Sequence, residues 1–243
     1  MGNEKNINSQ IIKFVDDNTK ELVSAYRVFQ KKDGANLVFY PVPKNANSSF
    51  KKLFVELLEI DEKFIFLDDE VPMIKKQQYD KNIIDDKNWL WSFLPPKPKF
   101  VELPNSLNAF KLAVVRDPVE RFISAYNNRV LWHQDNEFQN LSIKGVISNL
   151  KQKNFKNQHF LPQTFFLGHN PDYFTKISIM PSLDGMVNYI CNFFEKNIQL
   201  KSLQTNHSAN PISFEDIEPF INDLKIIYSE DYNFIKSIKS NII

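Results

Sequence analysis

The chain has 243 residues, and its 30 basic and 29 acidic side chains give a formal net charge of +1. This near-neutral balance argues against a generally basic nucleic-acid-binding or membrane-surface protein, so any anion site must be a local concentration of charge. Hydrophobic residues make up 42% of the chain and include 22 phenylalanines, as expected for a packed globule. This length predicts one domain over residues 1–243, with residues 1 to about 10 frayed.

Features that would export or anchor the chain are not evident. Residues Met1–Asn6 lack the apolar core of a signal peptide, and no uninterrupted apolar run approaches the ~20 residues of a membrane span. Cys191 is the only cysteine, so an intrachain disulfide is impossible, and its apolar neighbours at helical spacing predict a buried side chain. We therefore expect a soluble, cytoplasmic protein without an integral membrane segment.

Strands alternate with helices along the chain, which predicts an α/β fold with a central, mostly parallel sheet flanked by helices. A helix or a short strand is expected before about residue 30, followed by a turn at Lys31–Gly34. Apolar runs predict strands at 37–40, 64–67, 110–115 and 175–179. Helical spacing predicts helices at about 50–58, 118–130, 141–150, 183–196 and 214–238, the last broken near 229–231.

The most informative stretch joins the apolar strand Leu37–Tyr40 to a helix that starts near Phe50. Such a turn points backbone N–H groups and a helix N-terminus at one place, which attracts an anion because those N–H groups are unpaired. Lys44 adds a positive charge, and Ser48 and Ser49 add hydroxyl donors. The turn holds no glycine, so it is not the usual nucleotide P-loop. The pattern fits a phosphate-binding turn, but also an ordinary capped helix beside a solvated lysine.

A second candidate anion site follows the apolar strand Phe110–Val115. Arg116 stands at the carboxyl end of this strand, where open α/β sheets place their ligand contacts. Asp117 and Pro118 predict a helix start, and Ser124 lies about two turns along that helix. An arginine and a serine so placed can clamp a phosphate. Alternatively, Arg116 forms a salt bridge and the Asp-Pro pair only begins the helix.

Together, the two motifs resemble those of the sulfotransferases that use 3′-phosphoadenosine 5′-phosphosulfate (PAPS). Pro43–Phe50 resembles their 5′-phosphosulfate-binding loop, and Arg116–Ser124 is similar to their 3′-phosphate-binding motif. The likeness is greatest to the carbohydrate sulfotransferases, including heparan 2-O-sulfotransferase and the chondroitin and HNK-1 enzymes. His159–Gln163 and Leu224–Phe234 are similar to a His-aromatic-x-Pro-Gln segment and a Tyr-x-x-Asp-Tyr helix of this group. Residues 61–104 are unmatched.

The resemblance implies a fold related to the P-loop kinases. It also implies in-line transfer of a sulfuryl group from PAPS to a carbohydrate hydroxyl, which leaves adenosine 3′,5′-bisphosphate. Lys44 would neutralise charge on the leaving phosphate, while Arg116 and Ser124 would hold the 3′-phosphate. The residues implied in donor binding are Lys44, Asn45, Ala46, Asn47, Ser48, Ser49, Phe50, Arg116 and Ser124. Because side-chain charge replaces the magnesium of kinases, we expect no metal.

Transfer to a hydroxyl also needs a general base, ideally a group that titrates near neutrality. The histidines of the chain are His133, His159, His169 and His207. The resemblance favours His159, which lies in a matching segment. Heparan 2-O-sulfotransferase carries histidines before its Arg-Asp-Pro strand, and this chain has none there. His133 and the carboxylates Glu102 and Glu120 therefore remain alternatives.

Two other functions remain open on the sequence. One is a kinase-like phosphotransferase on the same fold, against which the missing Gly-x-x-x-x-Gly-Lys loop argues. The other is a nucleotide- or glycan-binding module without turnover. The partner expected under the favoured hypothesis is a carbohydrate or glycan acceptor, and no nucleic acid.

Overall fold

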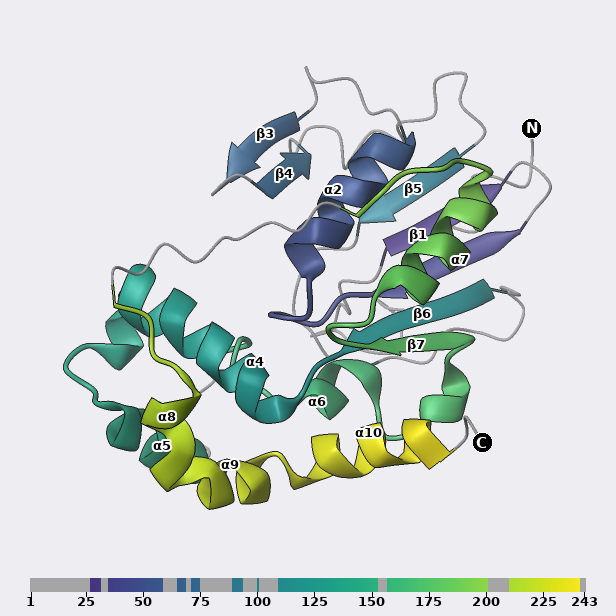
Figure 1. Cartoon of the computed structure of the whole chain (residues 1–243). Coiled ribbons are helices and arrows are strands. Elements are labelled where there is room, and N and C mark those ends of the chain that lie inside the picture. The colour runs from purple at the N-terminus through teal and green to yellow at the C-terminus, as the bar shows by residue number, and fades with distance from the viewer. Residues whose placement is uncertain are drawn as a thin grey trace, which may run out of the picture.

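The structure is a computed structural model that describes residues 27–31, 35–58, 65–68, 71–74, 89–93, 100, 109–152, 157–200 and 210–240. Its centre is a five-stranded sheet in the order β5-β1-β2-β6-β7, and Figure 1 shows helices on both sides of it. The strands are β1 (Arg27–Lys31), β2 (Asn36–Tyr40), β5 (Trp89–Phe93), β6 (Ala109–Val115) and β7 (Lys176–Ile179). A separate two-stranded antiparallel sheet contains β3 (Ile65–Asp68) and β4 (Val71–Ile74).

The sheet has a parallel part and an antiparallel edge. Strand β6 pairs in parallel with β2 on one side and with β7 on the other. Strand β1 pairs antiparallel with both β2 and β5. The predicted α/β class, with a central parallel sheet flanked by helices, is confirmed. The parallel pairing extends over β2, β6 and β7, whereas β1 runs in the opposite direction between β2 and β5.

Alternating side chains of the central strands build two cores, one on each face of the sheet. Leu37 and Phe39 pack with α2 (Asn47–Leu58) and α7 (Asp184–Phe194). Val38 and Tyr40 pack on the opposite face with α6 (Gln163–Leu167) and α10 (Ser229–Ser240). Cys191 is buried in the α7 core, as its apolar surroundings predict. Both faces of β2 and β6 are therefore packed against helices. This packing holds the two strands, and with them their carboxyl ends, in place.

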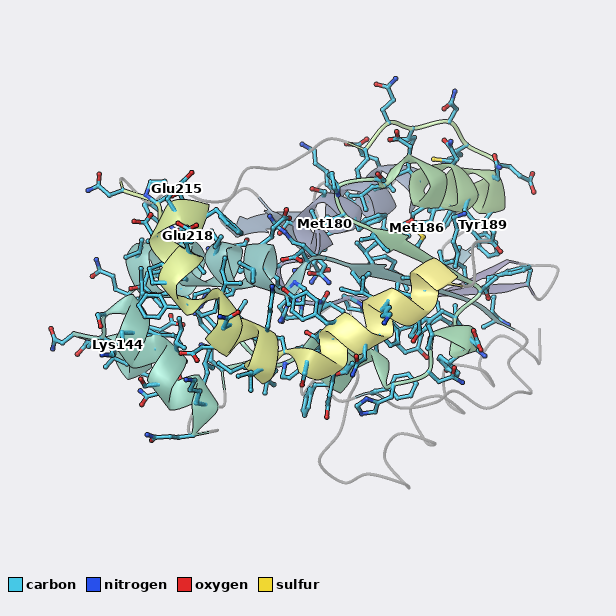
Figure 2. All side chains as sticks on the ribbon, turned by 60° about the horizontal axis from the view of Figure 1, so that its bottom comes forward. Lys144, Met180, Met186, Tyr189, Glu215 and Glu218 are labelled. Atoms are coloured by element: carbon cyan, nitrogen blue, oxygen red, sulfur yellow. The ribbon has the colours of Figure 1, made fainter. Side chains whose placement is uncertain are left out.

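The remaining helices form a group with its own apolar core. They are α4 (Pro118–Ala125), the π-helix η3 (Tyr126–Trp132), α5 (Ile143–Lys151), α8 (Phe214–Ile217) and α9 (Ile221–Ile227). Short 3-10 turns are η4 (Asn136–Phe138), η5 (Pro171–Tyr173) and η6 (Glu218–Phe220). Figure 2 shows this group, marked by Lys144 and Glu215, at the opposite end of the molecule from Met186 and Tyr189 of α7.

The predicted elements are present with changed ends. The helix expected over 118–130 is an α-helix to Ala125 and a π-helix to Trp132. The helix expected over 214–238 is interrupted more than once, and its last break falls at Tyr228, just before the predicted position. Residues 1–26, with the predicted frayed end, lie outside the described residues. Across the described part of the chain, no helix has the length and apolar character needed to cross a membrane.

Candidate active site

The turn between β2 and α2 has a strained backbone. Lys44 has φ 70° and Ala46 has φ 55°, in the left-handed region that residues with a Cβ atom seldom adopt. The Asn45 N–H donates to Val42 O at 3.2 Å, and the Phe50 N–H donates to Ala46 O at 3.0 Å. Non-glycine residues in this region cost on the order of 1–3 kcal/mol each and concentrate at functional sites. The turn is therefore a candidate site on geometry alone.

The predicted donor-binding residues divide into those that shape the turn and those at the start of α2. Asn45 is 1% exposed, and its Nδ2 donates to Val114 O at 2.8 Å. The Phe50 ring is buried, with its centroid 4.8 Å from that of Phe39. The N–H groups of Asn45 and Phe50, which the resemblance assigns to the donor, thus already serve the turn. Asn47, Ser48 and Ser49 form the first turn of α2.

The second motif begins a regular capped helix, as predicted. Asp117 Oδ1 accepts hydrogen bonds from the N–H groups of Val119 at 2.9 Å and Glu120 at 3.2 Å. Arg116 pairs with Glu120 through Nε and Oε2 at 3.2 Å, so the salt bridge of the alternative interpretation exists. The same guanidinium reaches Lys44 O at 3.5 Å through Nη1. Ser124 is partly buried near the end of α4, about two turns from Arg116.

Arg121 ties the two motifs to the histidine segment from within the core. Its side chain is 2% exposed. Nε donates to Pro43 O at 2.9 Å, and Nη1 donates to Leu161 O at 2.7 Å. Nη2 is buried and has no hydrogen-bond partner in the described part of the chain. A buried guanidinium with an unsatisfied donor is costly, and burial lowers the pKa of Arg121.

Gln163 is the meeting point of all four segments that carry the resemblance. Its Oε1 accepts from Asn45 Nδ2 at 2.6 Å and from the Arg116 N–H at 3.0 Å, and its Nε2 donates to Arg116 O at 2.8 Å. Asp231 of α10 accepts from the N–H groups of Gln163 at 2.8 Å and Thr164 at 2.9 Å. Segments far apart in the sequence are therefore fastened together at the carboxyl ends of β2 and β6.

Positive charge gathers around Lys44. Burial and the charge of Arg129 lower the pKa of Lys44 to about 7. Arg121 and Arg116 shift this pKa in the same direction, whereas Asp135 opposes them. Like charges held together in a partly buried place are unfavourable unless an anion lies among them. The donor set therefore fits a phosphate or sulfate group.

The π-helix that follows α4 supplies two contacts of this cluster. Lys44 Nζ donates to Asn128 Oδ1. Arg129 forms a bidentate pair with Asp135, with Nε–Oδ2 at 2.7 Å and Nη2–Oδ1 at 2.6 Å. Single stretches of π-helix are frequent at functional sites. The sequence predicts a regular α-helix over these positions, so the π-helix that places Asn128 and Arg129 in the site was not predicted.

His159 lies close to the same cations. Burial and the positive charge of Lys44 lower the pKa of His159 to about 3. Arg129, Arg121 and His133 shift it in the same direction. The imidazole is therefore neutral near pH 7, as a proton acceptor must be. Among the candidate bases that the structure describes, His159 has the closest electrostatic link to Lys44.

The alternative bases are less well placed or are not described. His133 is exposed near the end of the π-helix, and it contributes charge at His159. His169 is exposed. Glu120 is engaged by Arg116. His207 and Glu102 lie outside the described residues.

A bound metal ion needs several ligating side chains that lie close together. No group of three or more His, Cys, Asp or Glu side chains lies close enough together among the described residues. The expectation of a metal-independent protein stays a prediction, because only an assay with and without added metal tests it.

Several residues of the site were not predicted from the sequence. They are Asn128, Arg129, Asp135 and Asn157. Asn128 and Arg129 fall where a regular α-helix was expected, so their direction could not be deduced from a 3.6-residue period. Asn157 stands two residues before His159, the spacing at which an asparagine accepts from the backbone N–H, and that spacing was the available clue.

The strand-to-helix turns of this sheet bring a lysine, arginines and a helix N-terminus together at the carboxyl ends of parallel strands. This arrangement is typical of α/β proteins that bind an anionic ligand at that edge of the sheet. The sequence model of the Sulfotransferase family matches residues 27–234, and the chain belongs to this family. Searches of curated proteins and of solved structures gave no match. Membership makes the chain a transferase of sulfuryl groups, which requires a sulfate donor and an acceptor.

Proposed function

We propose that the protein, as one domain over residues 1–243, transfers the sulfuryl group of PAPS to a hydroxyl group of a carbohydrate. The observation that carries the proposal is the cluster of Lys44, Arg116, Arg121 and Arg129 around a strained turn. Burial and the three neighbouring guanidinium groups lower the pKa of Lys44 to about 7, and an anion placed among these cations removes their mutual repulsion. PAPS carries anionic groups at both its 5′ and its 3′ positions, so it can engage both turns.

In this proposal, the first turn holds the 5′-phosphosulfate. Backbone N–H groups at the start of α2, with the hydroxyl groups of Ser48 and Ser49, donate to its oxygens. Lys44 neutralises the charge that develops on the bridging oxygen as the bond to sulfur breaks. Asn45 and Phe50 act indirectly, because their N–H groups keep the turn in shape.

The second turn holds the 3′-phosphate, which distinguishes this donor from ATP. Arg116 offers a planar guanidinium that can bind a phosphate in a bidentate way. Its present partner Glu120 is about half exposed, with side-chain exposure of 52%, so exchange for a phosphate costs little. Ser124 supplies a hydroxyl donor from the same helix. Arg121 stays buried as the link between the turns.

His159 takes the proton of the attacking hydroxyl group. The acceptor oxygen forms a bond to sulfur, the bond from sulfur to the bridging oxygen breaks, and its electron pair stays on the bisphosphate. The pKa of about 3 applies to the protein without its donor, and depends on burial and on Lys44. Added negative charge beside Lys44 raises this pKa towards the ordinary value, so His159 becomes a stronger base when the donor is bound.

The first experiment is a comparison of thermal stabilisation by adenosine 3′,5′-bisphosphate, ADP and ATP with magnesium. A ligand at about 100 times its dissociation constant adds ~2.7 kcal/mol, which gives a clear rise in melting temperature. We expect the bisphosphate to stabilise the protein most. A preference for ATP with magnesium would instead favour the phosphotransferase, and no shift with any nucleotide would contradict the donor assignment.

A second experiment tests the acceptor. A panel of neutral, amino and acidic saccharides is incubated with PAPS and the protein, with and without a metal chelator, and bisphosphate release is measured. We expect saccharide-dependent release that the chelator leaves unchanged. Bisphosphate binding without release on any saccharide would contradict the carbohydrate assignment and favour a binding module.

A further inference from the structure

A chain of hydrogen bonds leads from the edge of the cationic cluster to His159. Asp135, held by Arg129, accepts a hydrogen bond from Asn157 Nδ2 through its Oδ2 atom at 3.3 Å. The same Nδ2 group donates to Glu137 Oε1. Two carboxylates therefore surround one end of the Asn157 amide.

This arrangement decides which way the amide points. An ionised carboxylate only accepts hydrogen bonds, so the NH₂ end of Asn157 must face Asp135 and Glu137. The amide oxygen then faces His159. Oδ1 accepts from the His159 backbone N–H at 2.9 Å and lies 3.0 Å from the ring atom Nδ1. The chemistry of these partners therefore fixes the orientation of the amide.

The amide orientation in turn decides the tautomer of the ring. Oδ1 is only an acceptor, so Nδ1 must carry the proton for this contact to be a hydrogen bond. A neutral imidazole with its proton on Nδ1 has a lone pair on Nε2. Since burial and the surrounding cations keep the ring neutral, the tautomer decides whether Nε2 can accept a proton.

We propose that Asn157, oriented by Asp135 and Glu137, is a positioning residue that holds His159 in the Nδ1–H tautomer and so presents Nε2 to the proton of the acceptor hydroxyl. This inference rests on the proposed function for its catalytic meaning, because His159 is a base only if transfer occurs. The tautomer itself belongs to the free protein and can be measured without substrate.

The charged groups that face His159 come from several elements. Lys44 lies in the first turn, Arg121 in α4, and Arg129 and His133 at or beside the π-helix. All of them oppose a positive ring. Among the described residues, the carboxylates of Asp135 and Glu137 contact Asn157, and Asn157 in turn contacts the ring of His159. Without the Asn157 side chain, both neutral tautomers of the ring should therefore be populated. The substitution adds no negative charge that would favour the protonated ring.

The experiment is long-range ¹H–¹⁵N NMR of the full chain with ¹⁵N-labelled histidine, near pH 7.5, where the two tautomers give different correlation patterns. His159→Gln assigns the His159 signals by their disappearance. We expect the wild-type ring to show only the Nδ1–H pattern and Asn157→Ala to show a large share of Nε2–H. Asn136→Ala is the matched control, because Asn136 contacts Gln139 on the exposed surface.

An Nε2–H ring in the wild type, or an unchanged tautomer in Asn157→Ala, overturns the inference. If Asn157→Ala does not fold, the tautomer measured in the wild type is enough to test the inference.

Activity and donor binding separate this inference from the function on which it rests. With an acceptor from the saccharide panel, Asn157→Ala should lower kcat by at least about tenfold, with little change in KM for PAPS. Bisphosphate stabilisation should be the same in all variants. If the bisphosphate does not stabilise the wild type, the assignment of PAPS as donor is contradicted. If Asn157→Ala has a normal kcat while His159→Gln is inactive, only the positioning role of Asn157 is contradicted.

Discussion

The two strand-to-helix turns of the site follow neighbouring parallel strands, yet they are built in opposite ways. The turn after β2 places Lys44 and Ala46 in left-handed conformations and gathers charge that it cannot neutralise. The turn after β6 has an aspartate cap and a proline in the first helical position, and none of its described residues has a positive φ. One turn is strained and electrostatically unfavourable, and the other is relaxed.

The difference indicates a division of labour. Strain and desolvated charge are concentrated where the developing charge of the reaction would lie, which is the arrangement that electrostatic catalysis requires. The relaxed turn supports the strained turn through two hydrogen-bonded side chains. Arg121 donates to Pro43 O, and Gln163 accepts from Asn45 Nδ2. If this is correct, substitutions in the first turn should affect turnover more than stability, and substitutions in the second should do the reverse.

The largest effect is expected for Lys44→Met. Removal of the charge that neutralises the leaving phosphate should lower kcat by about a thousandfold, or ~4 kcal/mol. The free protein should melt at a temperature no lower than wild type, because a disfavoured partly buried charge is gone. Lys52→Met, on the helix α2 that follows the turn, is the control for kcat and melting. Equal losses of stability in both variants would mean that the charge of Lys44 does not destabilise the folded protein.

Arg116→Ala is expected to have the next largest effect. Loss of a charge-assisted contact to the 3′-phosphate should weaken adenosine 3′,5′-bisphosphate binding by about 10- to 100-fold, and ADP binding by much less. Calorimetric titration with both nucleotides measures the difference. Glu120→Ala removes the salt bridge and keeps the guanidinium, so its selectivity should match wild type. Equal losses for both nucleotides in Arg116→Ala would remove the 3′-phosphate assignment.

Proton uptake on ligand binding follows from the pKa of Lys44. Its ordinary value is 10.5, and the folded protein lowers it to about 7, so near pH 8 the amine is mostly neutral. A bound bisphosphate raises this pKa, and the complex should therefore take up close to one proton. Titrations in buffers of different ionisation enthalpy measure the uptake. It should shrink below pH 7 and disappear in Lys44→Met, and uptake that survives in that variant would point to another group.

The same shift has a consequence for the free protein. The unfolded chain keeps the Lys44 proton up to about pH 10.5, whereas the folded chain loses it near pH 7. The contribution of this group to stability therefore rises between those values and is least favourable below pH 7. Wild type and Lys44→Met should differ most in melting temperature at the acidic end of this window.

Asp117→Ala tests the relaxed turn. Its carboxylate caps the N–H groups of Val119 and Glu120 and accepts a hydrogen bond from Tyr232. Loss of such a cap costs about 1 kcal/mol, within a range of about 0.5–2 kcal/mol. Urea unfolding measures the loss, and Asp117→Ser should recover most of it. A larger fall in kcat than in stability would contradict the division between the turns.

The smallest effect is expected for Ala46→Gly. Glycine adopts a positive φ without steric cost, but it also makes the unfolded chain more flexible, so the two contributions nearly cancel to within about 0.5 kcal/mol. The same substitution at Ala125, which is 0% exposed in α4, should destabilise by about 1 kcal/mol or more. Similar losses at the two positions would show that the first turn carries no strain.

Those parts of the fold that depend on local patterns could be predicted. The apolar strand and the helical spacing after it located β2 and α2, and Asp117-Pro118 located the start of α4. These features follow from the period of side chains along one element, which a single sequence displays directly. Lys44 and His159 were chosen partly by resemblance, and the structure brings them into electrostatic contact.

Features that depend on distant pairing could not be predicted. The antiparallel placement of β1 depends on partners in β2 and β5, and the second of these lies far along the chain. Gln163 and Asp231 are 68 residues apart, and nothing local to either one identifies the other. The change from α-helix to π-helix at Tyr126 alters the direction of only a few side chains, too few for a periodic pattern to reveal.

The carboxylate of Asp231 also sets an order of events in biosynthesis. Both turns and the histidine segment leave the ribosome before residue 231 is made, since the chain is synthesised from its N-terminus. Until then, the N–H groups of Gln163 and Thr164 lack the acceptor that α10 provides. The sheet can form early, but the site matures only when α10 docks. A nascent chain therefore carries the segments that would bind the donor before it has the carboxylate that holds them in register.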